Sequence, residues 1–369
     1  MRGSIRKRGE NSWELKIELE RINGKRHRRF VTVRGSYKEA QKELTRLLGA
    51  ADDGTLPDPT RMTVGEYLLA WLDTTHAQSP KTLERYCELA QRQIIPHLGH
   101  VKLPKLRPEN VEQWHSALLA SGLSARTVRH AHRVLSLVLK RAVENGTLAR
   151  NVAAVCKLPA VEADEVGILT PDQIAVVLDS LKGHSLFPIV SLALATGARR
   201  GELLALEWGD VDLDRGTLRV ERSVEETRAG GLRVKPPKTR HSRRTITLPS
   251  ETVAMMRAHK VQVLEVRLVL GLGNITAETL LFSNIEGKLL SPNNVTRGWH
   301  RACRARGLPA VSFHSLRHSF NSAMANAGVA EEVRMKLAGH STREIHAKYT
   351  HHEMQPLRAA IAAIPSLNK

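Results

Sequence analysis

The chain has 369 residues, which is enough for two or three domains with hydrophobic cores of their own. Lys and Arg number 56 against 37 Asp and Glu, and the resulting formal net charge of +19 favours a polyanionic partner such as nucleic acid. Three widely spaced cysteines exclude a disulfide-stabilised secreted scaffold. No signal peptide is recognisable and the longest apolar run is too short to span a bilayer, so we expect a cytoplasmic protein without a membrane segment.

Residues 1–58 predict a small basic domain of three strands and one helix. The segment Trp13–Glu20 alternates apolar and polar side chains, Asn23-Gly24 is typical of a hairpin turn, and Ser36 is a candidate helix N-cap. Eleven Lys and Arg against four Glu in residues 1–34 allow two interpretations. The sheet is either merely solvated or enters a DNA groove, and we favour the second. The candidate DNA-binding residues of this domain are Arg6, Lys7, Arg8, Arg26, Arg28 and Arg29.

Residues 59–160 predict an all-helical domain. Val64, Leu68 and Leu72 recur at helical spacing, and Pro80 and Pro108 mark helix starts. The last helix of this domain has one apolar face and one basic stripe. That stripe is either a solvated face or a contact with the DNA backbone. Its candidate DNA-binding residues are Arg126, Arg129, Arg133 and Lys140.

Residues 161–369 predict a mixed α+β domain. Helical patterns begin at Thr170-Pro171, at Ser291-Pro292 and near His314. Strand-like segments are 217–223, 232–235 and 244–249. The predicted fold class is therefore multidomain and mainly α with small β-sheets, comprising a three-stranded sheet plus helix, an all-α domain and an α+β domain.

The common enzyme signatures are missing from the sequence, which has no P-loop, no dinucleotide fingerprint and no CxxC pair. His314 and His318 are four residues apart on a predicted helix, a spacing that could bind zinc. The Glu that a metalloprotease has beside the first His is Ser315 here, and no third ligand is evident. We therefore expect no metal and no other cofactor.

Five sequence fragments in a fixed order carry the strongest functional signal. They are ATGARRGELLALEW (195–208), PPKTRHSRRTITLP (236–249), FHSLRHSF (313–320), LAGHS (337–341) and YTH (349–351). In these fragments the sequence resembles the tyrosine recombinases, or phage integrases, of the arm-binding type. The resemblance covers the whole chain in outline and its second half in detail. One departure is Ser315, where many members of the family have Asp.

The resemblance implies a domain organisation. Residues 1–58 correspond to an arm-type DNA-binding domain, 59–160 to a helical core-binding (SAM-like) domain, and 161–369 to the catalytic domain with a C-terminal tail at 353–369. The tail carries a short apolar strip. We expect this strip to dock on a neighbouring protomer.

The resemblance also implies the site residues and their roles. The catalytic residues are Arg199, Lys238, His314, Arg317, His340 and the nucleophile Tyr349, with Glu202 in a supporting role. Two guanidinium groups match two phosphate oxygens and keep their charge, so they can stabilise a pentavalent transition state without a metal. Tyr349 would form a 3′-phosphotyrosine, Lys238 would protonate the leaving 5′-oxygen, and His314 would help the phenol to ionise. The covalent bond conserves energy, so ATP is not needed.

The implied function is site-specific DNA recombination, the integration or excision of a phage or integrative plasmid through a Holliday junction. The expected partners are the core and arm attachment sites of double-stranded DNA, three further protomers in a tetramer, a host DNA-bending protein and an excision factor. Two alternatives remain. A type IB topoisomerase-like enzyme would cleave DNA without exchanging partners, and the three-domain layout disfavours it. A non-catalytic DNA-binding regulator is disfavoured by the complete set of six residues.

Overall fold

The computed structural model describes residues 2–22, 25–52, 60–75, 79–161, 167–237 and 242–339. The chain divides into two compact units, residues 1–162 and 163–369. Buried apolar side chains form separate clusters in the N-terminal sheet, in the helical segment after it, and in the second unit. No helix within the described ranges is both long and apolar enough to cross a membrane.

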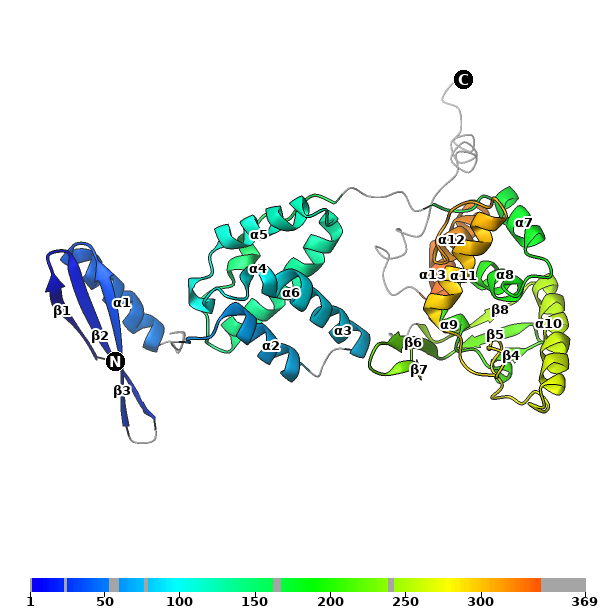
Figure 1. Ribbon diagram of the computed structural model, residues 1–369, viewed down its shortest axis with the longest axis horizontal. Helices are drawn as coiled ribbons and strands as arrows, with labels where there is room; N and C mark the ends of the chain where they lie inside the picture. Colours follow the sequence, from blue (N-terminus) through cyan, green and yellow to red (C-terminus); the bar gives the residue numbers. More distant parts are fainter. Residues whose placement is uncertain are drawn as a thin grey trace, which may run out of the picture. The chain divides into compact units, whose positions relative to one another are not determined.

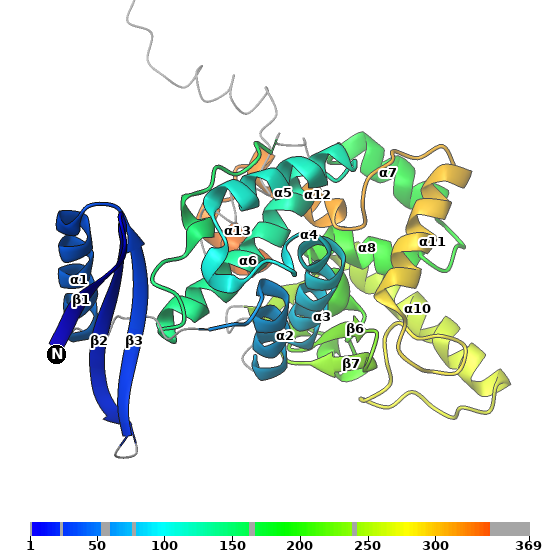
Figure 2. The ribbon, with the colours of Figure 1, turned by 60° about the vertical axis from the view of Figure 1, so that its left-hand side comes forward.

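An antiparallel sheet of three strands opens the chain. Its strands are β1 (Arg2–Gly9), β2 (Ser12–Ile22) and β3 (Lys25–Arg34), in that order. Helix α1 (Tyr37–Asp52) runs along one face of the sheet, as Figures 1 and 2 both show, and buries Leu15 and Ile17 completely. The Ser36 hydroxyl accepts a hydrogen bond from the backbone N–H of Glu39, whose carboxylate accepts one from the N–H of Ser36. The predicted N-cap is therefore confirmed, as one half of a capping box.

The rest of the first unit is helical. Its α-helices are α2 (Val64–Thr74), α3 (Pro80–Leu89), α4 (Ile95–Leu98), α5 (Pro108–Ala120) and α6 (Ala125–Glu144), with a π-helical turn at Ala90–Ile94 and 3-10 turns at Leu103–Lys105 and Val152–Val155. The hydroxyls of Thr63 and Ser79 cap α2 and α3, and Pro80 and Pro108 occupy the first helical turns as predicted. The apolar face of α6 is fully buried in the core of this bundle, which fixes the opposite, basic face toward solvent.

The second unit combines helices with two small antiparallel sheets. Its helices are α7 (Pro171–Ser180), α8 (Phe187–Thr196), α9 (Arg200–Leu203), α10 (Ser250–Val269), α11 (Pro292–Ala305), α12 (Ser315–Asn326) and α13 (Glu331–Ala338), with a 3-10 turn at Trp208–Asp210. Strands β4 (Val211–Asp212), β5 (Thr217–Val220) and β8 (Arg244–Thr247) form one sheet, and β6 (Ser223–Thr227) and β7 (Gly231–Lys235) form a hairpin. The apolar helix α8 lies at the centre and contacts α12 (Figure 1).

One strand prediction is wrong in its extent. Of residues 217–223, only 217–220 form β5, and Ser223 already begins β6 in the other sheet. The chain leaves the first sheet after Val220, and the guanidinium of Arg222 is held by Glu207 and Asp210 at 2.6 Å each. The apolar alternation of Leu218 and Val220 is interrupted at Arg222, which lies within the break. The predicted fold class, mainly α with small sheets, is confirmed.

Candidate active site

The first predicted arginine follows a tight turn at the end of α8. Gly197 has a left-handed backbone (φ 59°), and a Cβ atom there would lie 2.2 Å from the Cδ1 atom of Phe320. This position therefore requires glycine on both conformational and steric grounds. Arg199 is the N-cap residue of α9, and 37% of its side chain is exposed to solvent. The turn thus presents a guanidinium group that a ligand can reach.

A buried carboxylate orients this guanidinium. The side chain of Glu202 is 3% exposed, and its Oε1 lies 2.8 Å from Nη1 of Arg199. Its Oε2 accepts hydrogen bonds from the backbone N–H of Arg199 at 2.9 Å and from Nη2 of Arg244 at 3.0 Å. Burial alone would raise the pKa of Glu202, but the charges of Arg244 and Arg199 and the backbone N–H hold it below its usual value. Glu202 is therefore an anion that fixes two arginines.

The second predicted arginine lies on α12 and is almost wholly buried. Arg317 is 1% exposed, and its Nη1 and Nη2 donate to the carbonyls of Gly197 and Ala338 at 2.6 Å each. Nη2 of Arg199 donates to the next carbonyl, that of Gly339, at 3.3 Å. Two guanidinium groups from different helices therefore meet the backbone at the end of α13.

His314 precedes α12 directly and is the N-cap residue of that helix. Partial burial and the charges of Arg317, Arg199 and Arg200 lower the pKa of His314 to about 4, although part of the residue stays open to solvent. The imidazole is therefore neutral at pH 7, and one of its ring nitrogens can accept a hydrogen bond. Its ring stands perpendicular to that of His318, with the centroids 5.4 Å apart.

The structure brings Arg199, Glu202, His314 and Arg317 together. Three other predicted site residues, Lys238, His340 and Tyr349, lie outside the described residues, as does the tail at 353–369. Along the chain, β7 ends three residues before Lys238, and the described part ends one residue before His340.

The sequence prediction missed Arg244, which completes the ion-pair network around Glu202. Its side chain is 4% exposed, and it begins β8 within the fragment RRTITLP. The neighbouring Arg243 is exposed. The signal was the strand alternation itself, because Arg244 and Ile246 lie on the same side of β8 and Ile246 is buried.

The predicted DNA-binding residues of the N-terminal sheet divide between its two faces. Register places Arg6 opposite Glu14 and Arg28 opposite Glu18, on the face away from α1. The guanidinium of Arg8 lies 2.7 Å from the Glu14 carboxylate, at the same face.

Of the other three predicted DNA-binding residues of the sheet, two lie on the opposite face. In the strand register Lys7 lies opposite Trp13, and Arg29 lies opposite Ile17. Both therefore lie on the face of the sheet that α1 covers. The Lys7 ammonium lies 5.8 Å from the Trp13 ring centroid, so Lys7 has a contact within its own domain. The side chain of Arg26 lies outside the described part of the structure.

The predicted stripe on α6 is a continuous exposed surface. Arg126, Arg129, Arg133 and Lys140 are all exposed, on the side opposite the buried face of the helix. The Lys140 ammonium lies 3.8 Å from the carboxylate of Glu144 on the same helix. Because an exposed ion pair of this kind is weak, Lys140 can exchange Glu144 for a phosphate.

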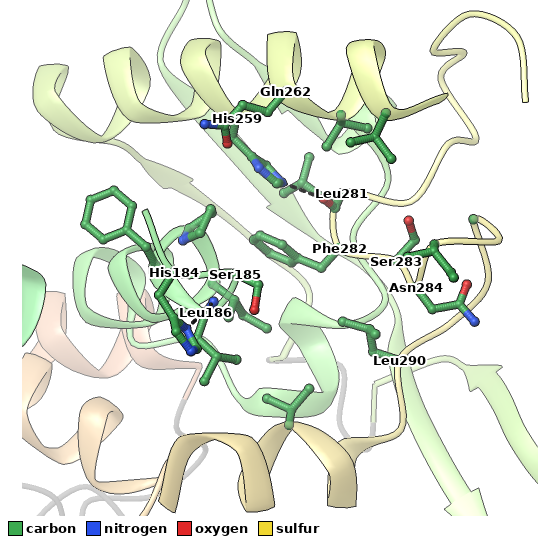
Figure 3. Close-up of a pocket in the computed structure, with 18 of the residues that line it drawn as sticks. His184, Ser185, Leu186, His259, Gln262, Leu281, Phe282, Ser283, Asn284 and Leu290 are labelled. Atoms are coloured by element: carbon green, nitrogen blue, oxygen red, sulfur yellow. Dashed lines mark hydrogen bonds between the residues drawn. The ribbon is translucent and has the colours of Figure 1, made fainter. Parts of the chain in front are cut away.

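A separate apolar cavity of about 510 Å³ lies between the start of α8, α10 and residues 281–290. Figure 3 shows His259 and Phe282 projecting into it, with the His259 imidazole bonded to the Leu281 carbonyl at 2.9 Å. None of its lining residues belongs to the predicted site. The apolar lining does not suit a phosphodiester, so this cavity is not the place of the DNA chemistry.

Comparisons with known proteins show the family of this chain. Residues 168–356 match the family model of the phage integrase family, and residues 63–119 match that of the phage integrase N-terminal SAM-like domain. An integrase of Streptomyces ambofaciens is 35% identical over 340 residues, covering 86% of this chain and 85% of that protein. A tyrosine recombinase XerC-like protein of Caldanaerobacter subterraneus is 27% identical over 367 residues, covering 94% of this chain and 93% of its own.

Solved structures show the same fold. The Tn1549 transposon integrase in complex with transposon right end DNA aligns with a TM-score of 0.71 at 19% identity, covering 83% of this chain and 100% of that one. A lambda integrase in a tetramer bound to a Holliday junction aligns with a TM-score of 0.59 at 17% identity, covering 94% of each chain. Fold, sequence and site together define a site-specific DNA recombinase of the tyrosine recombinase class. The chain belongs to the phage integrase family.

Proposed function

We propose that this recombinase integrates or excises a mobile DNA element by tyrosine-mediated cleavage and rejoining, without metal or ATP. The observation that carries the proposal is the pair of guanidinium groups of Arg199 and Arg317, anchored by backbone carbonyls and a buried carboxylate. Two fixed planar cations suit the non-bridging oxygens of a phosphodiester, whose charge increases in the transition state. Preorganised arginines supply the stabilisation that a metal ion supplies in other phosphoryl-transfer enzymes.

The chemistry follows from the residues of the predicted set. The Tyr349 oxygen attacks phosphorus, a bond from phosphorus to the phenolic oxygen forms, and the bond to the 5′-oxygen breaks. His314, neutral at pH 7, accepts the phenolic proton, and Lys238 gives a proton to the leaving 5′-oxygen. His340 donates a hydrogen bond to a phosphate oxygen. The 3′-phosphotyrosine then awaits attack by the 5′-hydroxyl of another strand.

The proposed DNA contacts use all three predicted domains, 1–58, 59–160 and 161–369. The face of the N-terminal sheet that α1 does not cover carries Arg6, Arg8 and Arg28 and is the proposed contact with arm sites. The basic stripe of α6 is the proposed contact with the backbone of the core site. The lambda integrase structure, a tetramer bound to a Holliday junction, supports a tetramer that acts through such a junction. A host DNA-bending protein and an excision factor complete the proposed partners.

Covalent trapping tests the proposed chemistry. The full-length protein is incubated, in EDTA and without ATP, with nicked duplexes that tile the DNA flanking its gene. A detergent-resistant protein–DNA adduct is expected with the wild type and is lost in Tyr349→Phe, while binding of the same duplex is retained. Tyr67→Phe, in the helical domain, is the matched control and keeps the adduct.

Three results would contradict the proposal. An adduct that survives in Tyr349→Phe removes this residue as the nucleophile, and an adduct that requires a divalent metal removes the metal-free mechanism. Specific binding without any adduct would favour a non-catalytic regulator. Relaxation of supercoiled DNA without strand exchange between two sites would favour the topoisomerase-like alternative.

A further inference from the structure

Three arginines from three different segments meet three successive carbonyls at the end of α13. Nε of Arg244 donates to Leu337 at 2.7 Å, Nη2 of Arg317 to Ala338 at 2.6 Å, and Nη2 of Arg199 to Gly339 at 3.3 Å. The last carbonyls of an α-helix have no partner within the helix, and its C-terminus carries a partial negative charge. Guanidinium groups satisfy both requirements, so the three arginines together form the C-terminal cap of α13.

Arg244 is nearly closed off from solvent and contacts three segments of the chain at once. Besides the Leu337 carbonyl, its Nη2 donates to the Glu202 carboxylate at 3.0 Å and its Nη1 to the Ser242 carbonyl at 3.0 Å. Its side chain is 4% exposed, so Arg244, like Arg317, is held inside the protein. A planar guanidinium can serve these three acceptors in fixed directions, whereas a lysine ammonium at the same place cannot.

We propose that Arg244 is a positioning residue. It holds Arg199 at a fixed position relative to the end of α13, from which the following chain segment starts. The link runs from Arg244 through Glu202 to Arg199 on one side, and directly to the last turn of α13 on the other. Gly339, the C-cap residue of that turn, precedes His340 immediately and Tyr349 by ten residues. The inference rests on the proposed function, in which Arg199 binds the phosphate that Tyr349 attacks.

The first test separates DNA binding from cleavage in the full-length protein. Arg244→Lys keeps a positive charge beside Glu202 but loses the fork that joins the three elements. It should leave the dissociation constant for the cleavable nicked duplex nearly unchanged. Single-turnover adduct formation should slow by ~10- to 100-fold, as expected for a lost hydrogen bond to a charged group.

The matched control is Arg222→Lys, an arginine of the same unit held by two carboxylates, Glu207 and Asp210, outside the network of Glu202. It should lose thermal stability to a comparable degree and keep the wild-type cleavage rate. Equal slowing in both variants would overturn the proposal, because the effect would then be a general loss of stability.

A second measurement asks whether Arg244 acts through Arg199. A duplex with a neutral methylphosphonate at the scissile position lacks the charge that Arg199 would stabilise. If Arg244 positions Arg199, the defects of Arg244→Lys and Arg199→Lys should both shrink on this substrate. A defect of Arg244→Lys that stays undiminished, while that of Arg199→Lys shrinks, would refute the link.

A third measurement needs no cleavage and no DNA. Hydrogen–deuterium exchange at the last turn of α13 should quicken by ~10-fold in Arg244→Lys, because its C-terminal cap is weakened. Exchange in α8 serves as the internal reference. Unchanged exchange in α13 would overturn the tie between Arg244 and this helix. If the wild type forms no adduct but exchange in α13 is still faster in Arg244→Lys, the proposed function is wrong. The contact between Arg244 and α13 is then still supported.

Discussion

Replacing Glu202 with glutamine should destabilise the second unit, because the carboxylate is buried between two arginines. Glu202→Gln keeps the size of the side chain but removes its charge, leaving Arg244 buried without an anionic partner. Breaking a buried ion pair typically costs ~3–5 kcal/mol. Arg199 is more than a third exposed and Arg244 keeps two carbonyl acceptors, so we expect a smaller loss of ~2–3 kcal/mol.

Calorimetric unfolding measures this loss. For a unit of about 200 residues it corresponds to a fall in Tm of ~5–10 °C. The control is Asp214→Asn, whose pair with Arg257 lies at the surface and should change stability by less than ~1 kcal/mol.

The pH dependence of the free energy of unfolding is an independent test of the ionised state of Glu202. The folded-state pKa of Glu202 is lowered from 4.5, so its stabilisation is complete above pH 4.5 and is lost as pH falls through the folded-state value. The difference between wild type and Glu202→Gln should therefore shrink in acid. A difference below ~0.5 kcal/mol at pH 7, or one that grows as pH falls, would refute the assignment of a buried, ionised carboxylate.

Three further predictions concern other parts of the chain. Burial and the neighbouring His115, 3.0 Å away, lower the pKa of His132 from 6.5 to about 4. The contribution of His132 to the stability of the helical segment should therefore be complete above pH 6.5 and be lost between pH 6.5 and 4. Unchanged stability in urea titrations over that range would contradict this. Arg129→Ala should reduce the slope of log K against log salt by ~0.9 in duplex binding, and an unchanged slope would remove its phosphate contact. Deleting residues 355–369 should impair recombination more than DNA binding by a monomer, which a strand-exchange assay beside a gel-shift assay measures; equal effects would discard tail docking.

Local patterns predicted the elements well, because caps and periodicity are written in adjacent residues. Ser36, Pro80 and Pro171 mark helix starts where their types indicate. The short helix α9 and the helices α10 and α13 were not predicted. The hydrophobic pattern of α10 is weak because much of its surface stays in water, and α13 is only eight residues long.

The site was predictable only as far as family motifs extend. The fragment around Arg199 and Glu202 is compact in sequence, so both residues could be named. Arg244 lies 42 residues from Glu202 and 93 from Leu337, and only the fold brings the three together. Pairings of this kind depend on how β8 and α13 pack, which no local signal encodes.

Because Arg199 and Arg317 cap α13, their presence in a related chain is not by itself a sign of catalytic activity. In many enzymes the active-site groups strain the fold, and their loss increases stability. Here Arg199 and Arg317 also satisfy backbone carbonyls, so removing either one would leave polar groups unpaired. A descendant that had stopped cutting DNA would still be selected to keep both arginines for the sake of its fold. Among such relatives, loss of the tyrosine is the more informative sign of lost activity.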